Sequence, residues 1–279
     1  MKDLYNEVCY KCSKLVTNNY STSFSLGVSL LHKDFVMPVH AIYGFVRFAD
    51  EIVDTFHTHN KKELLQRFIK DTHDAITDKI SLNPILHSFQ DTVNKYNIDI
   101  ELVNTFLKSM EMDLEKSEHN QTTYEKYIFG SAEVVGLMCL KIFVEGNEKQ
   151  YEELKHDAMK LGAAFQKINF LRDLKADYHI LGRAYFPGFQ IDNFNAVTKK
   201  EIEADIQKDF DNGLRGIKKL PRKARFGVYL AYIYYYALFT KIKNTPAEKV
   251  ISTRIRITDA RKYLLFFSSY LKHSFNLIK

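Results

Sequence analysis

Two stretches of the sequence place acidic or amide side chains four residues apart within otherwise apolar helical sequence. The first carries Asp50 and Asp54, and the second carries Asn169, Asp173 and Asp177. Residues at i and i+4 share one face of a helix. Two carboxylates about 6 Å apart repel each other by about 3 kcal/mol at an effective dielectric constant of 20, so the pattern favours a bound cation. Oxygen ligands without Cys or His favour Mg²⁺, with Mn²⁺ as a substitute.

Each acidic pair is accompanied by an arginine, Arg47 in the first stretch and Arg172 in the second. A single pair of this kind is more often a solvated helix face. Two pairs about 120 residues apart, both among apolar neighbours, favour a different interpretation. If their helices face each other across a bundle, the acids form a cage for several divalent ions with a diphosphate between them.

The elements that would position these acids are predicted to be helices throughout. Only 11 Gly and 5 Pro occur in 279 residues, too few for the frequent turns of a β-sandwich or barrel. Apolar residues recur with helical spacing, including one stripe of Leu4, Val8, Cys12 and Leu15. We expect one all-α domain over residues 1–279. A second stripe consists of Leu64, Phe68, Ile69 and Ala75–Ile76. Further helices are predicted at about 34–56, 84–95, 99–116, 122–144, 148–178, 199–219, 222–243 and 256–277.

Two local features fix the expected start of the helix that bears the first acidic pair. Asp34 is predicted to be its N-cap, and Pro38 is placed in its first turn, where the missing N–H is harmless.

The uncharged stretch Phe226–Thr240 is 15 residues long, short of the ~20 that a membrane span requires.

Charge is distributed unevenly along the chain. The net charge is +6, but from Leu214 onward fifteen Lys/Arg face two acids, so the first 213 residues sum to −7. A basic region suits nucleic acid, an anionic membrane surface or a polyanionic ligand, and a solvated basic helix face without a ligand is an equal alternative. No zinc-finger spacing, RNP-type aromatic motif or Gly-rich backbone clamp supports nucleic acid, which we exclude.

The N-terminal sequence and the cysteines indicate the compartment. Residues 1–14 alternate charged and apolar positions without the apolar core of a signal peptide. Cys9 and Cys12 form a CxxC motif, but no second CxxC pair or His cluster completes a zinc site. We therefore interpret the three cysteines as helix-packing residues in a reducing environment. A cytoplasmic location is expected, and peripheral association with an anionic membrane surface is a further hypothesis.

Four segments carry longer motifs. They are Tyr20–Phe24 (YSTSF), Tyr43–Asp54, Tyr127–Gly136, and Gln166–Asp177 with the GRAYFP segment at 182–187. In this combination the chain resembles the squalene/phytoene synthase family over residues 17–265, nearly its whole length. Three positions depart from the family pattern: Tyr20 replaces a His, Thr22 replaces a Lys, and Ala176 replaces an acid. The first two changes alter contacts to one diphosphate, for which Arg47 and Arg254 could compensate.

The resemblance implies a fold and a set of site residues. The fold would be an isoprenoid-synthase-type helical bundle around a central cavity that holds two allylic diphosphates. Metal ligands by resemblance are Asp50, Asp54, Asn169, Asp173 and Asp177, and Tyr43 and Arg47 join the four aspartates as catalytic residues. Implied substrate contacts are Ser21, Ser23, Arg47, Tyr127, Gln166, Asn169, Arg183, Tyr185, Tyr235 and Arg254.

The resemblance also implies a reaction, the head-to-head condensation of two prenyl diphosphates through a cyclopropylcarbinyl diphosphate. Gly27, Val28, His40 and Gly44 are small or moderate where bulky aromatics would shorten the cavity. This favours two geranylgeranyl diphosphates as substrates and phytoene as product, without NADPH. The alternative is a C30 synthase that makes squalene or dehydrosqualene from farnesyl diphosphate. A non-catalytic assembly factor is a remote alternative because both acidic rows are intact, and a head-to-tail prenyltransferase or terpene cyclase is less supported again.

Overall fold

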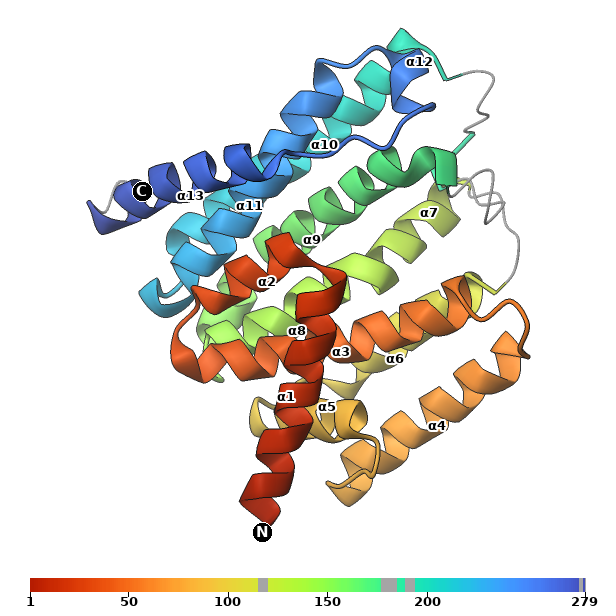
Figure 1. Cartoon of the computed structure of the whole chain (residues 1–279), viewed down its shortest axis with the longest axis vertical. Coiled ribbons are helices and arrows are strands. Elements are labelled where there is room, and N and C mark those ends of the chain that lie inside the picture. Colours follow the sequence, from red (N-terminus) through yellow and green to blue (C-terminus); the bar gives the residue numbers. More distant parts are fainter. Residues whose placement is uncertain (115–119, 177–184, 189–193, 276–277, 279) are drawn as a thin grey trace.

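The computed structural model describes residues 1–114, 120–176, 185–188, 194–275 and 278, and every regular element within them is a helix (Figure 1). The elements are α1 (Lys2–Tyr20), α2 (Thr22–Ser29), α3 (Lys33–Asp54), α4 (Lys61–Asp78), α5 (Pro84–Lys95), α6 (Ile100–Met112), α7 (Gln121–Ile128), the π-helical turn η1 (Phe129–Glu133), α8 (Val134–Phe143), α9 (Glu148–Ala176), α10 (Ala196–Lys219), α11 (Arg222–Lys243), α12 (Ala247–Val250) and α13 (Asp259–Ser274). The prediction of an all-α fold is confirmed. No helix in the described ranges combines the length and apolarity needed to cross a bilayer.

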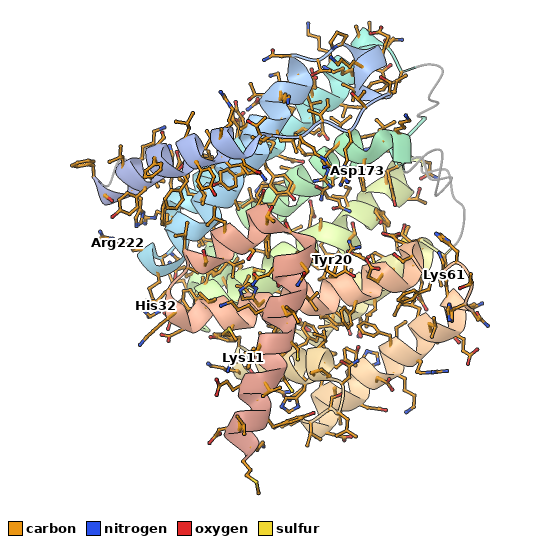
Figure 2. All side chains as sticks on the ribbon, in the orientation of Figure 1. Lys11, Tyr20, His32, Lys61, Asp173 and Arg222 are labelled. Carbon is orange, nitrogen blue, oxygen red and sulfur yellow. The ribbon has the colours of Figure 1, made fainter. Side chains whose placement is uncertain are left out.

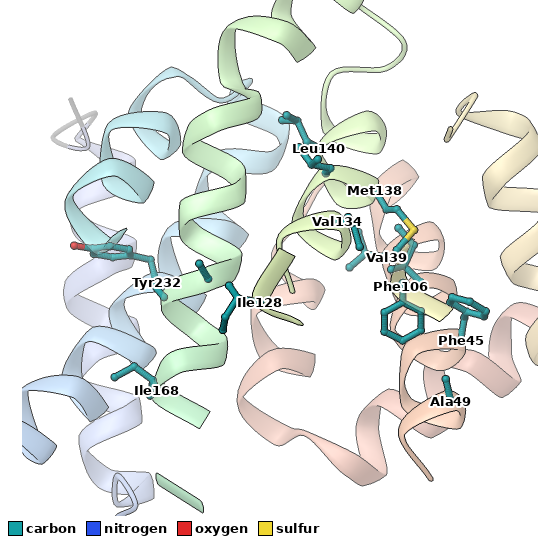
Figure 3. Close-up of a cluster of buried hydrophobic side chains, with 14 of the residues drawn as sticks. Val39, Phe45, Ala49, Phe106, Ile128, Val134, Met138, Leu140, Ile168 and Tyr232 are labelled. Carbon is teal, nitrogen blue, oxygen red and sulfur yellow. The ribbon is translucent and has the colours of Figure 1, made fainter. Parts of the chain in front are cut away.

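The bundle is built around α3, α8 and α9. Helix α8 packs against both α3 and α9, while α1, α4 and α5 cover α3 on one side and α10 and α11 cover α9 on the other (Figure 1). One continuous core runs through these layers (Figure 3). On the α3 side the ring of Phe45 stacks on Phe89, with centroids 3.8 Å apart, and lies 5.3 Å from Phe106.

Helix ends follow local sequence signals where the capping residue is polar. The side chain of Asn83 accepts hydrogen bonds from the N–H groups of Ile85 and Leu86, and Pro84 occupies the first turn, so α5 begins where its sequence predicts. The predicted ranges 84–95 and 222–243 are confirmed to the residue. The predicted helix at 122–144 is interrupted by η1, which no local signal announced.

The start of α3 differs from the prediction. His32, rather than Asp34, is the N-cap, and its Nδ1 accepts a hydrogen bond from the N–H of Asp34 at 3.5 Å. Pro38 therefore lies beyond the first turn, inside the helix. The N–H that Pro38 lacks would have bonded the carbonyl of Asp34. That carbonyl accepts a hydrogen bond from the hydroxyl of Tyr96 at 3.3 Å instead.

The apolar stripe predicted for α1 does not face the core. Leu4, Val8 and Leu15 are exposed, whereas the buried face consists of small residues such as Ser13. Helix α1 crosses α3 so closely that a Cβ on Gly44 would stand 2.9 Å from the Oγ of Ser13. Large apolar side chains cannot fit such a crossing, and they point outward.

Candidate functional site

The acidic stretches meet at a cavity of about 530 Å³ between α2, α3, η1, α8, α9 and α11. This volume lies in the range of small-molecule sites. On α3 the lining runs from Val39 to Asp50, and on α9 from Leu154 to Asp173. At 1.5 Å rise per residue these spans are about 17 and 28 Å. Both helices carry polar lining near their C-terminal ends. The lining before those ends is apolar except for Asp157 of α9, whose carboxylate is paired with Arg215.

We call Asp50 and Asp54 on α3 the first acidic row, and the oxygen-bearing residues of α9 the second row. Arg47 lies one turn before the first row. Its guanidinium donates to the carboxylate of Glu51, one turn away, and its Cζ lies 4.4 Å from the centre of the Tyr20 ring. Its Nε is buried and finds no hydrogen-bond partner among the described residues. Because Arg47 and Tyr20 both line the cavity, this unsatisfied donor suits an anionic ligand.

The carboxyl group of Asp50 is poorly stabilised as an anion. Burial raises the pKa of Asp50 to about 8, the neighbouring carboxylate of Asp54 adds to the rise, and Arg47 opposes it. Asp54 is the last residue of α3, and Asp113 caps the C-terminus of α6. Helix C-termini are themselves partially negative. Acids and helix ends therefore converge on a region that a cation would stabilise.

The second row, on α9, is neutralised by arginines. Both carboxylate oxygens of Asp173 accept hydrogen bonds from Nε of Arg172, at 3.0 and 3.1 Å, and Nε of Arg254 lies 2.7 Å from one of them. Asp173 stands near the end of α9 (Figure 2). Arg254, distant in sequence, thereby lines the same cavity.

An aromatic wall stands beside the second row. The ring of Tyr235 on α11 stacks on Phe165 of α9, with centroids 4.1 Å apart, and its hydroxyl donates to Oδ1 of Asn169 at 3.4 Å. Across the cavity Tyr43 stacks on Phe24 at 4.9 Å. These two ring pairs line opposite walls of the cavity.

The donor chemistry fits a hard divalent cation. Among the described residues no group of three or more His, Cys, Asp or Glu stands close enough to form a complete metal site. The candidate ligands Asp50, Asp54, Asn169 and Asp173 offer only oxygen atoms suited to Mg²⁺, and the raised pKa of Asp50 marks a carboxylate that a cation would relieve.

The structure places the predicted site residues in three groups. Those that line the cavity are Ser21, Tyr43, Arg47, Asp50, Tyr127, Gln166, Asn169, Asp173, Tyr235 and Arg254. Ser23, Asp54 and Tyr185 are described but are not part of the lining. Asp177 and Arg183 lie outside the described residues.

Asp113 is a residue that sequence reasoning missed. Its carboxylate accepts hydrogen bonds from the hydroxyl of Tyr127 at 2.7 Å and from that of Tyr185 at 3.5 Å. The ring of Tyr185 stacks on Phe170 at 4.0 Å, so Tyr185 supports Tyr127 from behind the cavity wall. Asp113 has no acidic partner at i+4 or i−4, so the spacing search passed over it.

Of the four residues expected to set the cavity's depth, two line the cavity and two do not. Gly27 and Val28 line the cavity, as expected. Gly44 and His40 do not line the cavity. Gly44 packs on Ser13 of α1, and His40 is buried beside Lys14 of α1. This burial lowers the pKa of His40 to about 4. The expectation that these two shape the cavity is wrong, because they lie on the α1 face of α3.

Glycines fix the wall formed by η1, α8 and α9. A Cβ on Gly162 would stand 2.6 Å from the carbonyl oxygen of Ala132, and one on Gly136 would stand 2.8 Å from that of Ala158. These distances are too short for any larger residue without a shift of the helices. The two glycines thus hold α8 and α9 in close contact along the cavity.

Comparison with known proteins agrees with this geometry. The family model described as squalene/phytoene synthase matches residues 17–261. Phytoene synthase 2, chloroplastic, of Solanum lycopersicum is 27% identical over 96% of this chain and 92% of its own length, and 4,4'-diapophytoene synthase of Staphylococcus haemolyticus is 24% identical over 92% and 94%. A crystal structure of a dehydrosqualene synthase covers 96% of this chain and 98% of its own, with a TM-score of 0.82 at 20% identity. The chain belongs to the squalene/phytoene synthase family, whose members are head-to-head prenyltransferases.

Proposed function

We propose that this chain, as one domain over residues 1–279, condenses two geranylgeranyl diphosphates head-to-head into phytoene. The observation that supports the proposal most is that α3 and α9 present acid-bearing ends to one cavity whose remaining walls are mainly apolar and aromatic. The polar part suits diphosphates, and the rest suits prenyl chains. A non-catalytic assembly role would not require such an arrangement.

Each row has a binding role in this proposal. Asp50 and Asp54, with Asn169, Asp173 and Asp177, would hold Mg²⁺, or Mn²⁺ in its place, which as a Lewis acid stabilises the departing diphosphate. Further contacts to the diphosphates are assigned to residues with hydroxyl, amide or guanidinium donors. These are Ser21, Ser23, Arg47, Gln166, Arg183 and Arg254.

The substrates supply the reacting atoms. One diphosphate leaves to give an allylic cation, the double bond of the second substrate attacks it, and loss of a proton gives a cyclopropylcarbinyl diphosphate. Departure of the second diphosphate, rearrangement and loss of another proton give the 1-1′ linked product. No reductant is consumed, so NADPH is not required. The faces of Tyr43, Phe165 and Tyr235 stabilise positive charge and exclude water.

Fewer residues than expected from the sequence support the assignment of the product's chain length. Gly27 and Val28 at the cavity favour the longer C20 substrates. The orientation of His40 and Gly44 toward α1 removes half of that argument and favours keeping a second candidate. That candidate is a C30 synthase that makes squalene or dehydrosqualene from farnesyl diphosphate.

One assay tests both candidates. The purified protein is incubated with Mg²⁺ and either geranylgeranyl or farnesyl diphosphate, with and without NADPH, and the product mass is measured. We expect phytoene from geranylgeranyl diphosphate irrespective of NADPH. A product from farnesyl diphosphate alone would establish the C30 candidate.

A double substitution tests the proposed roles of the two acidic rows. Activity that survives Asp50→Asn combined with Asp173→Asn would overturn those roles. Asp74→Asn, a change at an exposed carboxylate on α4, is the matched control.

A further inference from the structure

Helix α13 presents a large apolar face to solvent. Five of its residues and the one that follows it share this feature, each between 51% and 70% exposed: Tyr263, Leu264, Phe267, Tyr270, Leu271 and Phe275. They recur at intervals of three and four residues and thus occupy one side of the helix. We call this side the outer face of α13. Helix α13 lies at the edge of the molecule beside α11 (Figure 1).

The opposite side of α13 already provides its packing contact with the rest of the protein. The ring of Phe226 on α11 stacks on His273 at 4.7 Å and contacts Phe266 at 6.5 Å. The hydroxyl of Tyr234 donates to the carbonyl of Lys262 at 3.1 Å. Of the six outer side chains, Tyr270 also reaches Phe226, with ring centroids 6.1 Å apart, yet each of the six leaves more than half of its surface exposed. Contiguous exposed apolar surface of this kind marks an interaction site.

Two cations border the outer face of α13. Arg261 and Lys272 are both exposed, one near each end of the helix. The acid of α13, Asp259, is paired with Lys262 at 3.2 Å. From Leu214 onward the chain carries fifteen Lys/Arg and two acids. An apolar, aromatic strip bordered by Lys and Arg complements an anionic lipid surface, where rings sit at headgroup level and cations meet phosphates.

We propose that the outer face of α13 docks the protein onto a bilayer that contains anionic lipid, with the helix parallel to the membrane plane. The proposal does not depend on which prenyl chain the enzyme uses. It assigns a location to membrane contact, which charge composition alone cannot do. It also separates this surface from the cavity, since none of the six residues lines it.

The sequence offers a direct probe of docking. The chain contains no tryptophan, so Phe267→Trp introduces a single fluorophore on the outer face of α13. With vesicles of phosphatidylcholine and phosphatidylglycerol we expect its emission to shift to the blue and to be quenched by brominated lipid. The matched control is Leu82→Trp, at a position 92% exposed between α4 and α5, which should show neither change. Equal responses from both probes, or none from Trp at 267, would overturn the proposal.

Co-sedimentation separates the two contributions to binding. Leu264→Glu with Phe267→Glu should lower the vesicle partition coefficient roughly tenfold or more, since burial of these side chains supplies the apolar part of binding. Arg261→Glu or Lys272→Glu should each lower it about fivefold at low salt, and less at high salt. Unchanged far-UV circular dichroism and unchanged turnover of detergent-dispersed substrate would show that these variants are folded.

A second copy of the chain is the competing occupant, and the same variants exclude or establish it. Sedimentation velocity without vesicles should show one species whose mass does not change between wild type and the Leu264→Glu, Phe267→Glu variant. A dimer that this variant dissociates, together with a blue shift of the Trp probe that depends on protein concentration and not on lipid, would overturn membrane docking.

Discussion

Replacement of Asp50 by Asn should stabilise the metal-free protein at high pH. Burial, with the carboxylate of Asp54 as the next cause, raises the pKa of Asp50 from 3.8 to about 8. Between these two values the folded protein binds more protons than the unfolded chain, so stability is fully present below pH 3.8 and is lost as the pH rises toward 8. A rise of about four units, at about 1.4 kcal/mol each, corresponds to a cost of several kcal/mol above pH 8.

The assay is urea unfolding of the metal-free protein at a series of pH values from 4 to 9. The free energy of unfolding of Asp50→Asn should equal that of the wild type near pH 4 and exceed it by several kcal/mol near pH 9. Asp74→Asn, at an exposed carboxylate paired with Lys70, should give the same small offset at every pH.

Magnesium supplies the second half of this test. Mg²⁺ with inorganic diphosphate should raise the stability of the wild type near pH 8 and leave Asp50→Asn unchanged. Binding to the wild type at pH 7 should also release protons, which calorimetry in two buffers of different ionisation enthalpy detects. If Asp50→Asn is destabilising at pH 9, the carboxylate is stabilised by the fold itself, and the argument that it requires a cation fails.

Three further substitutions test individual contacts. Gly162→Ala places a Cβ 2.6 Å from the carbonyl oxygen of Ala132 and should lower the free energy of unfolding by about 1–3 kcal/mol; guanidinium titration without a loss would contradict the tight crossing. Arg254→Ala removes an ion pair to Asp173 and should raise the KM for the prenyl diphosphate roughly tenfold, with partial recovery in Arg254→Lys; an unchanged KM would remove Arg254 from the diphosphate site. Asp113→Ala removes a half-buried hydrogen-bond acceptor and should cost about 1–3 kcal/mol by the same titration, whereas an equal loss in Asp113→Asn, which keeps an acceptor, would argue against the hydrogen bond.

The helices could be predicted wherever local chemistry decides their ends. Asn83 and Pro84 start α5, and Pro221 and Pro246 bracket α11 and the turn that follows it, so those limits were readable. Helix α1 shows where local reasoning fails. Its apolar stripe predicts a helix correctly but predicts the wrong buried face, because the crossing with Gly44 admits only small side chains and this is a tertiary constraint.

The site was predictable to the extent that its chemistry repeats along the sequence. Asp50 and Asp173 were found because each belongs to an acidic row, and both line the cavity. Asp113 was missed because its partners Tyr127 and Tyr185 are 14 and 72 residues away. The orientation of His40 was also misjudged, since which face of α3 meets α1 depends on how the helices pack.

The layout of α3 and α9 has an evolutionary consequence. In both helices the candidate diphosphate- and metal-binding residues occupy the C-terminal turns, and mostly apolar lining residues occupy the turns before them. Under the proposed function, natural substitutions at Ile42 or Leu154 would lengthen or shorten the accepted hydrocarbon while the charged lining residues stay unaltered. Related lineages can diverge in product size through single apolar exchanges, without passing through an inactive ancestor.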